Sequence, residues 1–224
     1  LTSAPITVTL TAEEVNDAPV LDIIGDKNVN EMSGLSFTLT ASDSDIPAQT
    51  LIFSVDGQLP DGATFDATTA TFNWKPTEAQ GPGNYSVAFK VCDNGDPARC
   101  SEPQIVVIKV AEVNTEPTAP PQQLTVSRTV PTEITLLASD PDLPAQELKF
   151  EILKQPQTGT VVLKGATAVF SPWPINASGG SFQYKVCDNG DVSKCSIGNV
   201  VLVYQADLGE ESGRIFLPIV ATMP

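Results

Sequence analysis

Glu112-Val113-Asn114-Thr115-Glu116-Pro117 is the boundary between two related parts of the chain, because the sequence before it recurs in changed form after it. The stretch has its own counterpart upstream in Glu14-Val15-Asn16-Asp17-Ala18-Pro19. Val91–Asp96 and Val186–Asp191 both read Val-Cys-Asp-Asn-Gly-Asp, and each is followed by a second cysteine at the same spacing. A duplication of this length indicates two tandem domains, since the units of solenoid proteins are about 20–50 residues long.

The repeat sets the domain boundaries that we expect. The tail after the second domain carries an apolar stretch, Ile215–Val220, which either docks on that domain or serves as a processing or anchoring segment. The expected divisions are 1–13, the last strand of a preceding module or an N-terminal extension; 14–113, the first β-sandwich; 114–205, the second β-sandwich; and 206–224, a C-terminal tail.

Amino-acid composition and net charge limit the kinds of binding partner that we expect. The chain has 224 residues, of which 41% are hydrophobic, so it can bury two cores of ordinary size. Its formal net charge of -15 argues against nucleic acid or an anionic membrane surface as a partner and favours cations. We recognise no signal peptide and no membrane-spanning segment, which needs roughly 18 apolar residues, and therefore expect a mature fragment of a longer protein.

The four cysteines fall into two close pairs, and the chain has no Cys-x-x-Cys spacing. This pattern predicts the disulfides Cys92–Cys100 and Cys187–Cys195 rather than a metal or redox centre. Disulfides persist in oxidising compartments, so we expect an extracellular or cell-surface location.

Alternation of apolar and polar residues predicts strands throughout the chain and almost no helix. In the first domain, Ser36–Ala41 and Tyr85–Val91 each place an apolar row on one face. Pro19–Val29 is predicted as the first strand of this domain and Thr7–Leu10 as an edge strand before it. About seven strands in about ninety residues is the spacing of an Ig-like sandwich.

The end of the first domain resembles the end of a cadherin repeat. Asp93, Gly95 and Pro97 stand in the order Asp-x-Gly-x-Pro, and a serine, a closing strand and the junction asparagine Asn114 follow. The domain is similar to bacterial cadherin-like repeats, and its middle part, including Phe72–Gly81, resembles the dystroglycan-type Ig subclass.

The second domain is similar to the cadherin-like bacterial Ig repeats of large surface proteins, on stretches such as Gln155–Thr160 and Phe170–Pro172. The two resemblances cover almost all of residues 14–205. They imply an all-β chain of two tandem Ig-like/cadherin-like Greek-key β-sandwich domains in a large surface or secreted protein.

The resemblance also implies Ca²⁺ at the junction of the two domains. Calcium takes 6–8 oxygen ligands, so carboxylates must converge from several loops. Thr115 stands where an acid is expected, whereas Asp17 fills that place upstream, so we expect weak binding of about 10⁻⁴–10⁻³ M. The candidate ligands are Glu31, Glu78, Glu112, Asn114, Glu116, Asp140, Asp142 and Asp188.

In an alternative interpretation, the acidic pairs bind no metal ion. Asp43–Asp45 and Asp140–Asp142 are also typical of polar turns in which aspartates accept hydrogen bonds from their own backbone. Neither run continues as an EF-hand loop, which needs a third ligand and a glycine.

Catalysis is not expected. Histidine is absent from the chain, and no serine or cysteine has a recognisable base beside it. The preferred hypothesis is a calcium-stiffened structural or adhesion module, monomeric, with neighbouring modules and another surface protein or a glycan as partners. The alternative is a non-catalytic carbohydrate-binding module attached to a secreted hydrolase. The chain is only 6% aromatic, and we expect core or strand-end roles for Trp74 and Trp173, which disfavours a sugar-stacking face.

Overall fold

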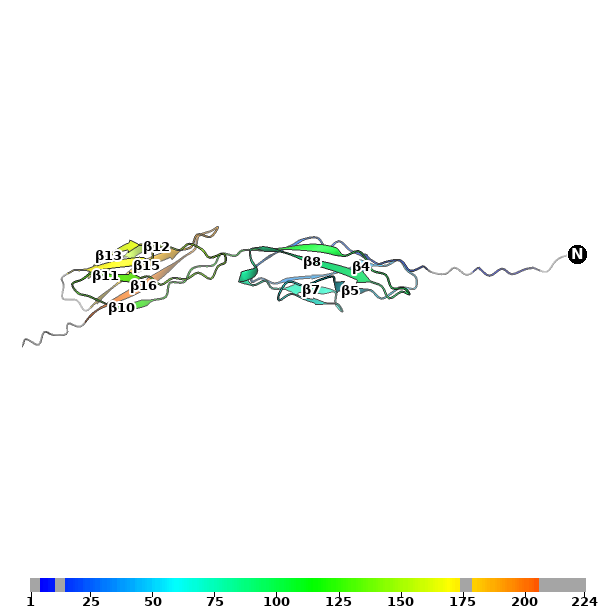
Figure 1. The fold of residues 1–224 in the computed structure, drawn as a ribbon, viewed down its shortest axis with the longest axis horizontal. Coiled ribbons are helices and arrows are strands. Elements are labelled where there is room, and N and C mark those ends of the chain that lie inside the picture. Colours follow the sequence, from blue (N-terminus) through cyan, green and yellow to red (C-terminus); the bar gives the residue numbers. More distant parts are fainter. Residues whose placement is uncertain (1–4, 11–14, 174–178, 206–224) are drawn as a thin grey trace, which may run out of the picture. The chain divides into compact units, whose positions relative to one another are not determined.

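The computed structural model describes residues 5–10, 15–173 and 179–205 (Figure 1). Within these residues the chain forms sixteen strands and one short 3₁₀ turn, which confirms the predicted all-β fold class. The chain divides into two compact units, which we call unit 1 and unit 2. Unit 1 comprises Leu1–Val113 with Asp142–Pro144, and unit 2 comprises Asn114–Pro141 with Ala145–Pro224.

Unit 1 is a sandwich of two main sheets and one two-stranded ribbon. One sheet has the order β2-β9-β8-β5 and the other the order β3-β7-β6, while β1 pairs with β4. β9 runs parallel to β2 and antiparallel to β8. The strands are β1 (Val20–Leu21), β2 (Lys27–Asn30), β3 (Leu35–Thr38), β4 (Ala41–Ser42), β5 (Ile52–Val55), β6 (Thr64–Asp66), β7 (Thr71–Trp74), β8 (Gly83–Cys92) and β9 (Gln104–Ala111).

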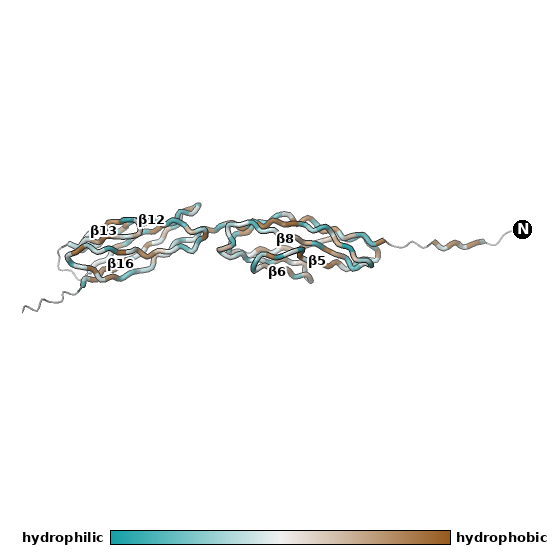
Figure 2. Tube along the Cα trace, viewed as in Figure 1, coloured by the Kyte–Doolittle hydropathy of each residue, from teal (hydrophilic) through white to brown (hydrophobic). Residues whose placement is uncertain are grey.

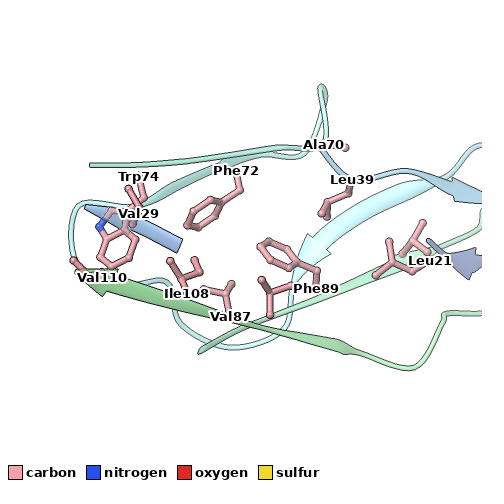
Figure 3. Close-up of a cluster of buried hydrophobic side chains, with 12 residues drawn as sticks. Leu21, Val29, Leu39, Ala70, Phe72, Trp74, Val87, Phe89, Ile108 and Val110 are labelled. Carbon is pink, nitrogen blue, oxygen red and sulfur yellow. The ribbon is translucent and has the colours of Figure 1, made fainter. Parts of the chain in front are cut away.

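The core of unit 1 follows from the period-two pattern of its strands, since alternate residues point to opposite faces. Val87 and Phe89 of β8 face Phe72 and Trp74 of β7 (Figure 3). The Phe72 and Phe89 rings meet edge to face with centroids 6.0 Å apart, a favoured aromatic geometry. Trp74 is buried, as expected, and its indole N–H donates to the Asp61 carbonyl at 3.0 Å.

Unit 2 repeats this plan with the sheets β10-β16-β15-β12 and β11-β14-β13. Its last strand also runs parallel to the first strand of its sheet, because β16 pairs in parallel with β10. The strands are β10 (Gln122–Val126), β11 (Thr132–Thr135), β12 (Lys149–Lys154), β13 (Gly159–Lys164), β14 (Thr167–Pro172), β15 (Gly179–Cys187) and β16 (Cys195–Tyr204).

The core of unit 2 lies between these two sheets. Phe182 and Tyr184 of β15 and Val200 of β16 are fully buried together with Phe170 of β14. Hydrophobic and hydrophilic segments are interspersed along the chain in both units (Figure 2), as strands with one buried and one exposed face require. β16 ends at Tyr204, where the sequence predicts the end of the second fold.

Both predicted disulfides are present, and no cysteine is free. Cys92 pairs with Cys100, and Cys187 pairs with Cys195. Each bond closes the loop between the last two strands of its unit.

Two strand predictions are wrong. Pro19–Val29 is not one strand: Gly25 adopts a left-handed φ of 66° and separates β1 from β2. The Lys27 ammonium donates to the carbonyls of Ile24 and Gly25 and stabilises this turn. Thr7–Leu10 is not a strand either, since nothing within the described part of the chain pairs with it, and an extended segment becomes a strand only through a neighbour's hydrogen bonds. The prediction for the tail, 206–224, lies outside the described residues.

Candidate metal centre

Three of the eight predicted ligands converge at one end of unit 1. Glu31 follows β2 and Glu112 follows β9, so the parallel pairing of these strands brings both residues to the same sheet edge. Glu78 begins the 3₁₀ turn Glu78–Gln80. One carboxylate oxygen from each glutamate can be chosen so that all three lie within 4.8 Å of one another.

Backbone hydrogen bonds fix Glu31 in this cluster. Its N–H donates to the Ala111 carbonyl at 3.0 Å, and Val113 N–H donates to Glu31 Oε1 at 2.8 Å. The side chain is only 1% exposed. Gly81 packs against Glu31 Oε2 so closely that a Cβ there would collide with it. The chain therefore holds a buried carboxylate in one defined position.

The turn that carries Glu78 is held by its neighbour Gln80. Thr77 N–H donates to Gln80 Oε1 at 2.8 Å, and Gln80 Nε2 donates to the Asp61 carbonyl at 3.0 Å. The Tyr85 hydroxyl donates to the Gln80 carbonyl at 2.9 Å. These bonds attach the turn to the body of the sandwich on two sides.

The electrostatics of the three glutamates are unfavourable without a counter-charge. Burial, followed by the nearby charges of Glu31 and Glu78, raises the pKa of Glu112 to about 7. Glu31 Oε2 and both carboxylate oxygens of Glu112 are buried and, within the described part of the chain, accept no hydrogen bond. Buried polar atoms are normally satisfied, so orphaned oxygens need an explanation.

A hard cation fits this arrangement. Calcium binds carboxylate oxygens at about 2.4 Å, so two oxygens that share one ion lie at most about 4.8 Å apart. The three glutamates meet this limit and offer oxygen ligands alone, the donor set that calcium prefers. Glu31, Glu78 and Glu112 could therefore hold the ion.

The predicted ligands Asn114 and Asp188 lie together in unit 2, but they bind each other. Asn114 Nδ2 donates to Asp188 Oδ2 at 3.2 Å and to the Val192 carbonyl at 3.0 Å. Gln146 Nε2 donates to Asn114 Oδ1 at 2.5 Å. Asp188 Oδ1 accepts from the N–H groups of Gly190 and Lys194 at 3.2 and 2.9 Å. Both carboxylate oxygens of Asp188 are thus already satisfied by protein donors.

The other predicted ligands have separate positions. Glu116 Oε1 accepts a hydrogen bond from the Ser196 hydroxyl at 3.0 Å. Asp140 and Asp142 lie in the loop between β11 and β12, and Asp142 belongs to the three residues that group with unit 1. That these residues complete the glutamate cluster stays a prediction.

At the other end of unit 1, Asp43 and Asp45 form the polar turn that the alternative hypothesis describes. Asp45 N–H donates to Asp43 Oδ1 at 3.0 Å, and Asp17 N–H donates to Asp45 Oδ2 at 2.9 Å. Gln49 Nε2 donates to the same Asp45 oxygen at 3.1 Å. Gln49 and Gln146 are not among the functional residues that the sequence predicts, yet Gln49 donates to Asp45 and Asn16, and Gln146 donates to Asn114.

The chain matches two families in succession. Residues 18–111 match the family model described as "Putative Ig domain", and residues 114–201 match the model described as "Bacterial Ig domain". No curated protein sequence matches the chain. Within the described residues no helix is long and apolar enough to cross a membrane.

Solved cadherin structures have a similar fold. The protocadherin gammaB4 extracellular domain aligns with 86% of the chain at 18% identity and a TM-score of 0.53, over 35% of its own length. Repeats EC21-23 of human CDH23 align with 84% at 17% identity and a TM-score of 0.55, over 65% of their length. Mouse cadherin-23 EC22-24 aligns with 86% at 19% identity and a TM-score of 0.52, over 67% of its length. The chain therefore spans between about a third and two thirds of these structures.

Proposed function

Because this chain is a tandem of two Ig-like domains with a cadherin-like fold, we propose that it is a structural or adhesion module of an extracellular or cell-surface protein, stiffened by Ca²⁺. The observation that carries this proposal is the trio Glu31, Glu78 and Glu112, with its orphaned buried oxygens. The two disulfides support an extracellular location, since such bonds persist in oxidising compartments.

The trio lies where the chain leaves unit 1, since Glu112 directly follows β9 and the second family match begins at residue 114. Burial and then the charges of Glu31 and Glu78 raise the pKa of Glu112, and the two positive charges of a bound calcium would offset most of the negative charge of the trio. Asp140 and Asp142 of the following repeat are the proposed further ligands. Ligands from both repeats on one ion would restrict the motion of the connecting chain.

A module of this kind needs no catalytic group, and its partners would be the neighbouring modules of the same protein and a further surface protein or glycan. The carbohydrate-binding alternative loses one of its two candidate stacking residues, because Trp74 is buried in the core of unit 1. Trp173 is about half exposed at the end of β14.

Calcium titration of the wild-type chain and of Glu78→Gln tests the proposal. Ligand that binds only the folded state stabilises it by RT ln(1 + [L]/Kd), about 1.4 kcal/mol at ten times Kd. We expect millimolar calcium to raise the Tm of unit 1 by a few degrees. Glu78→Gln removes one charged ligand and should abolish most of this shift.

The matched control is Glu102→Gln, which removes an exposed acid of unit 1 outside the trio. This variant should keep the full calcium shift. A calcium shift of the same size in all three proteins, or no shift in any of them, would show that the trio does not bind the ion.

A further inference from the structure

The hydrogen bonds around Asn114 in unit 2 have a counterpart in unit 1. Asn16 Nδ2 donates to Asp93 Oδ2 at 3.1 Å and to the Pro97 carbonyl at 3.0 Å. Gln49 Nε2 donates to Asn16 Oδ1 at 2.5 Å. We call this arrangement the asparagine clasp: in unit 1 it consists of Asn16, Gln49, Asp93, Gly95 and Pro97, and in unit 2 of Asn114, Gln146, Asp188, Gly190 and Val192.

The clasp is buried and closely fitted in unit 1. Asn16 is 9% and Asp93 is 2% exposed. Asp93 Oδ1 accepts from the N–H groups of Gly95 and Arg99 at 2.9 and 2.8 Å, and these bonds help to hold the pKa of Asp93 below its usual value although burial acts in the opposite direction. A Cβ on Gly95 would collide with the Asn16 amide. Within this space an asparagine supplies two N–H donors to the loop and one acceptor to Gln49.

The clasp joins two parts of the chain that are far apart in sequence. Asn16 lies in the segment that leads into unit 1, before β1. Asp93 and Pro97 lie in the loop that the Cys92–Cys100 disulfide closes, and this loop leads into β9. The incoming segment is therefore bound directly to the loop before the last strand, although about eighty residues separate them.

This connection matters when the chain is pulled from both ends, as it is in a structural module between neighbours. Tension that arrives at Asn16 passes through Asp93 into the disulfide-closed loop and then along β9. The strands from β1 to β7 lie outside that path. When the clasp opens, the load falls on the sandwich itself, including the parallel β2–β9 ladder.

We infer that the asparagine clasp is a mechanical contact, which carries tension from the incoming chain to the last strand of each unit without a metal ion. The presence of the clasp in both units supports this role, since in unit 2 as in unit 1 an asparagine binds the loop that the disulfide closes. The inference rests on the proposed structural function but not on calcium, because protein donors satisfy both carboxylate oxygens of Asp93.

Single-molecule force spectroscopy of the whole chain in the presence of a calcium chelator tests the inference. With handles at the two ends, Asn16→Ala should shorten the lifetime of unit 1 under constant load by about tenfold or more, the factor that a lost hydrogen bond to a charged group corresponds to. Unit 2 keeps its own clasp and is the control within the same molecule. Asn28→Ala, which changes an exposed asparagine of β2, should leave both lifetimes unchanged.

A second pulling geometry distinguishes a contact that transmits the applied force from one that only stabilises the folded state. With the N-terminal handle moved to Ala67, in the exposed turn between β6 and β7, the load no longer passes through Asn16. Asn16→Ala should then have little effect on the lifetime of unit 1. Equal shortening in both geometries, or none in either, would overturn the inference.

Gln49→Ala is the milder second variant in case Asn16→Ala does not fold. It removes the donor to Asn16 Oδ1 and leaves the two bonds to the loop in place. It should shorten the lifetime of unit 1 only in the end-to-end geometry and by a smaller factor than Asn16→Ala. An equal change in the lifetime of unit 1 in both geometries would contradict the mechanical role of the clasp for this variant as well. Because all measurements are made in chelator, their failure is distinct from a failure of the calcium titration.

Discussion

At the scale of one residue, the carboxyl group of Glu112 should make the stability of unit 1 depend on pH. Its pKa is raised from 4.5 to about 7 by burial and by the charges of Glu31 and Glu78. An acid with a raised folded-state pKa stabilises the folded state fully below its unfolded pKa, and this contribution is lost as pH rises through the folded value. Without metal, unit 1 should therefore lose stability between about pH 4.5 and 7.

Scanning calorimetry in chelator across this pH range measures the effect. The Tm of unit 1 should fall as the pH rises, and Glu112→Gln should make the fall smaller because the neutral amide does not repel Glu31 and Glu78. Glu102→Gln should retain the wild-type slope. If the Tm of unit 1 rose steadily from pH 4.5 to 7, the assignment of a raised pKa to Glu112 would be wrong.

Single residues also show where sequence reasoning stopped. The trio could be predicted because each glutamate occupies a position at which the resemblance to cadherin-like repeats implies a calcium ligand. The hydrogen bonds between Asn114 and Asp188 could not, because they depend on rotamers and on the absence of a Cβ at Gly190. Residue types alone do not distinguish an acid that awaits a cation from one that is satisfied by an amide.

At the scale of elements, β15 and β16 depend on a glycine beneath an aromatic ring. Tyr184 of β15 is paired with Gly198 of β16, and a Cβ on Gly198 would collide with the buried Tyr184 ring. The Tyr184 hydroxyl also donates to the Leu137 carbonyl at 2.5 Å, so the ring cannot move away freely.

Gly198→Ala should therefore destabilise unit 2 by about 1–3 kcal/mol, the usual cost of overpacking a core. Gly34→Ala is the matched change, since Gly34 has open space around its Cβ position and no left-handed φ. Urea unfolding would measure both. Gly34→Ala should leave the free energy of unfolding of unit 1 at its wild-type value. A wild-type free energy of unfolding for unit 2 in Gly198→Ala would show that Tyr184 yields to the added methyl group.

The disulfide loops also make a measurable contribution to the free energy of unfolding. In the loop-entropy model, a bond that closes a loop as short as Cys92–Cys100 contributes about 2.5 kcal/mol. The double variant Cys92→Ser with Cys100→Ser should lower the free energy of unfolding of unit 1 by about this amount in urea and leave unit 2 unchanged. Loss of stability in both units would mean that they do not unfold independently.

Strands were predictable where alternation continues over several residues, as in Tyr85–Val91, which lies within β8. Prediction failed where a local turn intervened. Pro19–Val29 was predicted as one strand, but it contains a turn at Gly25, whose φ is left-handed, and this turn separates β1 from β2. In Thr7–Leu10 the pattern was correct for a strand, but pairing depends on a partner that the pattern does not contain.

At the scale of the whole molecule, the proposed function predicts that calcium stiffens the connection between the two units. The acids predicted to act together come from both repeats, Glu31, Glu78 and Glu112 from the first and Asp140 and Asp142 from the second. Without metal, their like charges repel, and the connection should allow a broad range of arrangements. With metal, shared ligands should select a narrower range.

Small-angle X-ray scattering of the wild-type chain and of Glu112→Gln, in chelator and in millimolar calcium, measures this change. Calcium should narrow the distribution of interunit distances in the wild type and have little effect on the variant. Identical wild-type scattering curves with and without calcium, at a concentration where titration shows the ion to be bound, would contradict this prediction.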